Sequence, residues 1–261
     1  MRPPLRAVGT SQGTDCKGSE KEMWFLLDSN VTAGYYLPRS LNSRKAADRI
    51  SDIFDSSRSS QRRDFFYIPN FCIAEVFSVF MKHCFGKWNR HLHKKGTIDR
   101  RVYENLCKQF QSDIHNGRFL YHYELNRYHI LGINLVAPID HYFKITRSNK
   151  QVSPMGTFDH LIISMGIHLA HIHGAENVCI LSTDDRLTDI LRKCKGKIKP
   201  STVNALKLNM AKQVSGKDFG PELFPKHLNL KTVSNKELLD VFGAWPLKKG
   251  KLPPVYRWRR L

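Results

Sequence analysis

Residues 23–31 read MWFLLDSNV, and this stretch decides how the chain folds. An apolar run that turns acidic and polar at once is typical of a buried strand whose carboxyl end opens into a polar crevice. In open parallel α/β sheets, ligands bind in the crevice beyond the strand ends. A second run, VCILSTDD at 178–185, repeats this design and also ends on carboxylates. Two strands that direct acids at the same edge of a sheet predict a metal site there.

The rest of the chain alternates between strand and helix patterns. Further strands are predicted at 65–68, 118–124 and 228–233, and helices at 35–53, 71–85, 102–114, 125–143, 157–173, 185–193 and 234–242. We expect Thr157 to cap its helix, and Ser234 with Glu237 to form a capping box. Strands that alternate with helices predict an α/β protein: a three-layer α/β/α sandwich with a largely parallel central sheet.

Size and charge set bounds on the organisation and the partners. The 261 residues are enough for one large domain or two small ones. We expect a loose leader at 1–22, a domain at 23–243, whose bounds follow from the family resemblance described below, and a basic C-terminal arm at 244–261. Basic insertions are expected at about 86–117 and 195–222. A formal net charge of +19 favours a polyanionic partner, and nucleic acid over a membrane surface. Six scattered cysteines and the lack of a long apolar run favour a reduced, cytoplasmic setting.

Four acidic residues stand in a recognisable series. They are Asp28 in DSN, Glu75 in IPNFCIAEVF, Asp159 in FDHLIISMGIHLA and Asp185 in LSTDDRL. The series resembles the PIN-domain nucleases, in which a first strand ends in Asp-x-Asn and a glutamate lies in the helix after the second strand. In that family an aspartate opens a later helix, and the next strand runs into Thr-x-Asp. The resemblance covers roughly residues 23–243, although the basic insertions exceed the compact toxin-type members.

The resemblance implies a Mg²⁺- or Mn²⁺-dependent nuclease. Its catalytic metal ligands, directly or through water, would be Asp28, Glu75, Asp159 and Asp185. The threonine spacing selects Asp185, while Asp184 could also reach the metal. Asn30 and Thr183 are expected to orient the ligands by hydrogen bonds. Hard oxygen ligands without nearby Cys or His suit Mg²⁺ or Mn²⁺ rather than Zn²⁺, and such an ion can activate water for phosphodiester hydrolysis.

Simpler roles exist for several of these residues. An aspartate in the first turn of a helix is favoured by the helix dipole, which would by itself explain Asp159. A lone carboxylate in an apolar helix, such as Glu75, more often faces solvent. His168, His171 and His173 lack the i, i+4 spacing of a zinc pair, so phosphate contacts or ordinary surface histidines are expected instead.

The basic segments are expected to contact nucleic acid, through Lys94, Lys95, Arg257, Trp258, Arg259 and Arg260. Aromatic faces interleaved with cations suit stacking on unpaired bases. The leading hypothesis is a toxin-like endoribonuclease acting on single-stranded or structured RNA, with an inhibitor protein (an antitoxin) or a second copy as further partners. Two alternatives stay open: a catalytically inactive RNA-binding module on the same fold, and a structure-specific DNA nuclease.

Overall fold

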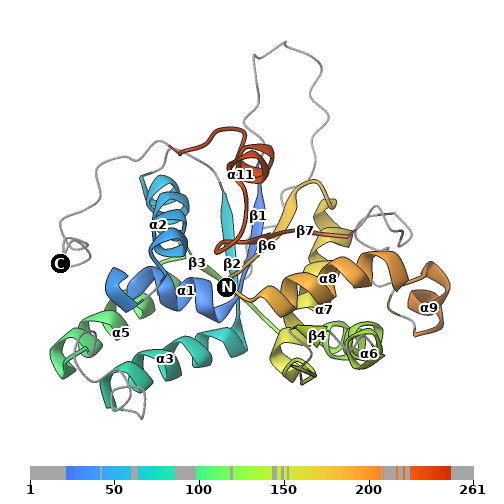
Figure 1. Cartoon of the computed structure of the whole chain (residues 1–261), viewed down its shortest axis with the longest axis horizontal. Coiled ribbons are helices and arrows are strands. Elements are labelled where there is room, and N and C mark those ends of the chain that lie inside the picture. The colour runs from blue at the N-terminus through green and yellow to red at the C-terminus, as the bar shows by residue number, and fades with distance from the viewer. Residues whose placement is uncertain are drawn as a thin grey trace.

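The protein is built around a five-stranded parallel sheet (Figure 1). The computed structural model describes residues 22–41, 43–59, 64–85, 98–117, 120–142, 146–147, 150–151, 153–206, 208, 216, 220 and 224–247. The sheet strands are β1 (Trp24–Leu27), β2 (Phe65–Pro69), β3 (Leu120–Tyr123), β6 (Val178–Ser182) and β7 (Lys226–Asn229). Their order across the sheet is β3-β2-β1-β6-β7.

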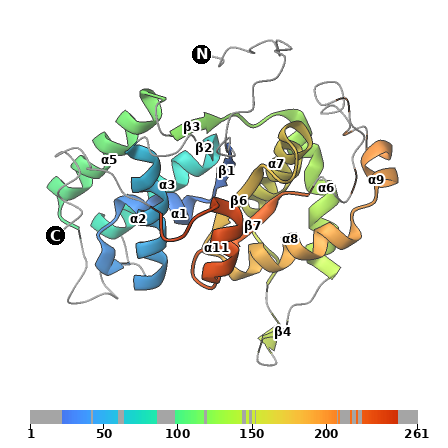
Figure 2. The same ribbon diagram turned by 90° about the horizontal axis from the view of Figure 1, so that it is seen from above.

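Helices cover both faces of this sheet (Figures 1 and 2). One face carries α1 (Ser29–Tyr36), α2 (Arg44–Arg58), α3 (Asn70–Phe85) and α5 (Arg100–His115), with a 3₁₀ turn η1 at Arg39–Leu41. The other carries α6 (Arg127–Tyr142), α7 (Thr157–His173), α8 (Asp185–Lys197) and α9 (Pro200–Ala205). The remaining elements are an antiparallel pair, β4 (Thr146–Arg147) and β5 (Lys150–Gln151), and the late helix α11 (Asn235–Phe242). The predicted α/β architecture with a helix-flanked parallel sheet is confirmed.

The central strand β1 is apolar throughout because both of its faces are covered. On one face, the Trp24 ring stacks on His173 of α7 with centroids 4.5 Å apart. On the other, the Phe25 ring stacks on Phe242 of α11 at 5.1 Å and on Phe66 of β2 at 5.2 Å. Successive side chains of a strand point to opposite faces, so each face of β1 is closed by its own helices.

The topology places a switch point between β1 and β6. From β1 the chain adds β2 and then β3 on one side, and it later returns to add β6 and β7 on the other. The two central strands end together, since Leu27 pairs with Leu181 and the backbone N–H of Asp28 donates to the carbonyl of Leu181 at 3.0 Å. The carboxyl edge at such a switch point is where open α/β sheets place their ligand crevice.

Several local predictions differ from the structure. Gly156, and not Thr157, is the N-cap of α7, because the Asp159 carboxylate accepts from the Gly156 N–H and so replaces a side-chain cap. The last strand occupies Lys226–Asn229 and not 228–233, since these residues pair with Cys179–Ser182 of β6. The insertion predicted at 195–222 contains the end of α8 and all of α9. The capping box of Ser234 and Glu237 is confirmed.

Some predictions concern residues outside the described part of the chain. They include nearly all of the leader at 1–22, the first part of the insertion at 86–117, and most of the arm at 244–261. Within the described residues, no helix combines the length and the apolarity that crossing a membrane requires.

Candidate functional site

Asp28 lies at the centre of the site, directly after β1. Its side chain caps α1 and is 2% exposed. Burial raises the pKa of Asp28 above its usual value, although the Ser182 hydroxyl donates to its Oδ2 at 2.8 Å and opposes the shift. The charge of Asp184 adds to the increase. Folding therefore places a carboxylate where it is poorly solvated and next to another acid.

Glu75 reaches the same place from α3. Burial raises the pKa of the Glu75 carboxyl, the Ser29 side chain opposes this by hydrogen bonding, and the charge of Asp28 raises the pKa further. Cys72, one turn earlier on α3, is fully buried, and its raised pKa reflects burial followed by the charges of Asp28 and Glu75. Glu75 is thus half-buried against the site and does not simply face solvent.

Asp159 comes from the opposite layer, in the first turn of α7. Its pKa is raised to about 6 by burial and then by the charges of Asp28, Asp184 and Glu75, and the Gly156 N–H opposes the increase. A helix N-terminus alone would stabilise the ionised carboxylate and lower its pKa. The capping role is real, but it does not explain an acid held against three others.

The fourth acid of the cluster is Asp184. Its charge raises the pKa of both Asp28 and Asp159, and its Oδ1 caps α8 by accepting from the N–H groups of Arg186 and Leu187. The Asp185 carboxylate instead accepts from the side chain of Asn229, at the end of β7, at 2.7 Å. In the structure, Asp184 therefore lies near Asp28, whereas Asp185 is hydrogen-bonded to the end of β7.

Of the two side chains expected to orient the ligands by hydrogen bonds, one does so at the predicted position and the other is replaced by the residue before it. Asn30 donates to Oδ2 of Asp28 at 3.4 Å, as predicted. The hydroxyl expected from Thr183 is supplied by Ser182, which donates to Asp28 and accepts from the Asp184 N–H at 2.8 Å. The sequence STDD contains two overlapping hydroxyl-x-Asp patterns, Ser182 with Asp184 and Thr183 with Asp185. Ser182 is the residue that the sequence analysis missed.

These four acids (Asp28, Glu75, Asp159 and Asp184) are called the acidic cluster below. In the part of the chain that the structure describes, no three His, Cys, Asp or Glu side chains lie close enough to hold a metal ion directly. Mg²⁺ usually keeps several waters and binds through only one or two protein carboxylates. The chemistry of the cluster, hard oxygens that repel one another, fits an ion held partly through water.

A further buried acid, Asp140 of α6, has a different role. Its carboxylate accepts from the Met155 N–H at 2.7 Å, forms an ion pair with Arg186 of α8 at 2.6 Å, and contacts His160 of α7 at 3.1 Å. These hydrogen bonds and the charge of Arg186 outweigh burial and hold the pKa of Asp140 below its usual value. Asp140 therefore joins three helices and positions the first turns of α7 and α8 beside the cluster.

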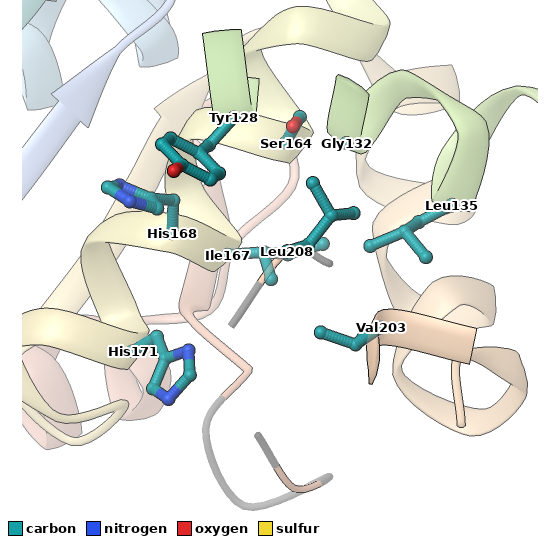
Figure 3. Close-up of a pocket in the computed structure, with 9 residues that line it drawn as sticks. All are labelled: Tyr128, Gly132, Leu135, Ser164, Ile167, His168, His171, Val203 and Leu208. Atoms are coloured by element: carbon teal, nitrogen blue, oxygen red, sulfur yellow. The ribbon is translucent and has the colours of Figure 1, made fainter. Parts of the chain in front are cut away.

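His168, His171 and His173 of α7 lie away from the cluster, and the expectation of a surface histidine is wrong for His171. His171 is 3% exposed, and His168 lines a small cavity between α6, α7 and α9 (Figure 3). Burial lowers the pKa of His168 to about 4. Its Nδ1 lies 3.1 Å from Nε2 of His129 and 3.3 Å from the Tyr123 hydroxyl. With a volume of about 30 Å³, the cavity holds little more than water.

The basic residues predicted to contact nucleic acid lie outside the described residues: Lys94, Lys95, Arg257, Trp258, Arg259 and Arg260. The five cysteines that the structure describes are all free, consistent with their scattered spacing. Comparison with known proteins adds no family: no family model matches the chain, and neither does any curated protein or solved structure.

Proposed function

We propose that the protein is a Mg²⁺- or Mn²⁺-dependent nuclease that hydrolyses phosphodiester bonds of RNA. The observation that carries the proposal is the acidic cluster at the switch point of a parallel sheet, in a chain with a net charge of +19. A protein that only binds a polyanion gains nothing from concentrated negative charge at its ligand crevice. A divalent cation relieves the repulsion between the acids and also attracts a phosphate.

The roles of the residues follow from their surroundings. Asp28, at the end of β1, and Asp159, at the start of α7, would hold the ion, with Glu75 and Asp184 acting directly or through water. Ser182, Ser29 and Asn30 orient the Asp28 and Glu75 carboxylates. When bound, the ion would supply activation of water and stabilisation of the charge that develops on the phosphate.

The proposal is tested with Asp28→Asn and Asp159→Asn in the full chain. Each should lower Mn²⁺-dependent cleavage of a labelled single-stranded RNA by at least about a hundredfold, because an electrostatic group acting on the reacting phosphate is lost. Asp240→Asn is the matched control, since Asp240 is an exposed aspartate on α11. Circular dichroism checks that all three variants stay folded.

Assays with several nucleic acid substrates distinguish the proposed ribonuclease from the two alternative functions. Duplex DNA and flap DNA, assayed beside single-stranded RNA with Mn²⁺ or with EDTA, distinguish a ribonuclease from a structure-specific DNA nuclease. Tight RNA binding with no cleavage of any substrate would identify an inactive RNA-binding module. Full activity of both Asp28→Asn and Asp159→Asn would contradict the proposed mechanism.

A further inference from the structure

Two aromatic rings meet at the edge of the acidic cluster. Phe71, in the first turn of α3, and Phe158, in the first turn of α7, stack with centroids 5.0 Å apart and an interplanar angle of 18°. They come from opposite sides of the sheet, so the pair bridges the carboxyl edge where both helices begin. Phe158 is 47% exposed although it is a large apolar side chain. Exposure alone is ordinary for a single apolar side chain, so it is the place of this ring at the edge where α3 and α7 begin that makes it a candidate contact for a ligand.

Each of the two rings belongs to a helix that also carries one acid of the cluster. Phe158 directly precedes Asp159 in α7, and Phe71 lies four residues before Glu75 in α3, so their side chains are neighbours on one helix face. Phe71 therefore lies beside Glu75, and Phe158 is held next to it by the stacking of the two rings. A phosphate at the cluster would have its own sugar and base within reach of the exposed Phe158 ring.

We propose that Phe158, supported by Phe71, is a stacking platform for an unpaired nucleobase next to the scissile phosphate. This inference rests on the proposed nuclease function and adds the substrate class: single-stranded nucleic acid. Stacking on an aromatic face tolerates any base, because every base has a π-face. A base inside a duplex is already stacked on both sides, and it would have to be unstacked to reach the ring.

The apolar contact of Phe158 with Phe71 can be separated from the stacking surface that the exposed Phe158 ring offers, which permits a sharp test. Phe158→Leu keeps an apolar side chain against Phe71 but removes the exposed ring, and Phe158→Tyr keeps the ring. Phe85→Leu is the matched control: Phe85 is 62% exposed, contacts the Tyr103 ring at 5.4 Å, and lies about 21 Å along α3 from Phe71.

Binding is measured with Ca²⁺ in place of Mn²⁺, so that a cation can accompany the phosphate. The probe is an unstructured single-stranded RNA that carries 2-aminopurine, whose fluorescence is quenched when it stacks. Phe158→Leu should weaken binding about tenfold and reduce the quenching, because aromatic stacking contributes strongly to single-strand affinity. Phe158→Tyr should restore both values, and Phe85→Leu should change neither. Duplex RNA should bind wild type and Phe158→Leu equally.

Cleavage is measured in parallel with Mn²⁺, so that the two proposals fail separately. If wild type cleaves and Phe158→Leu raises KM with kcat unchanged, both proposals are supported. If wild type cleaves and Phe158→Leu alters neither binding nor KM, the platform is wrong and the nuclease stands. If nothing is cleaved but Phe158→Leu still weakens binding and quenching, the platform stands as a binding site and the nuclease proposal fails.

Discussion

At the scale of single residues, the site depends on which of two adjacent aspartates faces Asp28. The pattern STDD offers both Ser182-x-Asp184 and Thr183-x-Asp185, and no property of the residue types chooses between them. The choice depends on where β6 ends and α8 begins. Because Asp184 caps α8 and Asp185 is its first helical residue, their side chains diverge. Asp28, Glu75 and Asp159 have no adjacent acidic residue, so the sequence offers a single candidate at each of these three positions.

This divergence leads to a prediction for two neighbouring substitutions of the same chemistry. Asp184→Asn should reduce cleavage by about a hundredfold or more, since its charge acts on Asp28 and Asp159. Asp185→Asn should reduce it by no more than about tenfold, because the Asp185 carboxylate accepts a hydrogen bond from Asn229 at the end of β7 and its charge is not among the causes of the raised pKa values of Asp28 and Asp159. The measurement is kcat/KM on one RNA. The reverse order would restore the Thr183-x-Asp185 assignment.

The raised pKa of Asp159 predicts how metal-free stability depends on pH. Folding raises the pKa of this carboxyl from 3.8 to about 6, so the protonated form favours the folded state. That contribution is complete below pH 4 and is lost as the pH rises through 6. In EDTA, Asp159→Asn should therefore be more stable than wild type at pH 7.5, and the two should converge near pH 4.

Urea unfolding at a series of pH values measures the difference between wild type and Asp159→Asn, which cancels the titrating groups that do not interact with Asp159. Addition of Mn²⁺ at pH 7.5 should stabilise wild type much more than the variant, because an ion bound to the folded state alone shifts the equilibrium by mass action. A variant that is less stable than wild type in EDTA at pH 7.5 would show that the Asp159 carboxylate is not under repulsion.

At the scale of secondary structure elements, the strands were easier to predict than the boundaries around them. Val178–Ser182 is buried on both faces, and Phe65–Pro69 is buried on one face and mostly half-buried on the other, so the apolar composition of these short runs identifies them. The last strand lies at the sheet edge, where residues 228–233 alternate in polarity but only Lys226–Asn229 pairs with β6. Pairing with a neighbouring strand is a property of the fold, and a single segment does not contain it.

The position of α7 depends on a close approach that the sequence does not reveal. Gly166 lies against β6: an added Cβ would lie 2.5 Å from Cδ1 and 2.9 Å from Cγ1 of Ile180, whose side chain is fully buried. Gly166→Ala should destabilise the protein by about 1–3 kcal/mol, since a buried β-branched neighbour has little room to move. It should also lower cleavage, because α7 carries Asp159 and Phe158.

Gly196 in α8 gives the matched control for this substitution. An added Cβ at Gly196 would meet nothing within 4 Å, so Gly196→Ala should stabilise the helix by up to about 1 kcal/mol. Urea unfolding measures both variants, and RNA cleavage is assayed on each. Equal stability changes in the two variants would mean that α7 can move away from β6 without cost.

At the scale of the whole molecule, charge is separated between the acidic site and the rest of the chain. The protein has 42 Lys and Arg residues against 23 Asp and Glu, yet four of its acids gather at one edge of the sheet. Long-range attraction of a polyanion therefore has to come from the surrounding basic residues, while the cluster would admit a phosphate only together with a cation. Affinity and cleavage should then respond to different substitutions.

The C-terminal segment provides the clearest test of this separation. Residues 248–261 contain six Lys or Arg residues and no acid, whereas Leu247 is 6% exposed and belongs to the core, so the deletion should begin at 248. Removing 248–261 should weaken single-stranded RNA binding and reduce the slope of log K against log salt by up to about four, at about 0.7 for each phosphate contact. Phe158→Leu is the control, because loss of stacking should lower affinity with the slope unchanged. An unchanged slope after deletion would mean that the six cations do not contact the RNA backbone and that other basic residues supply the attraction.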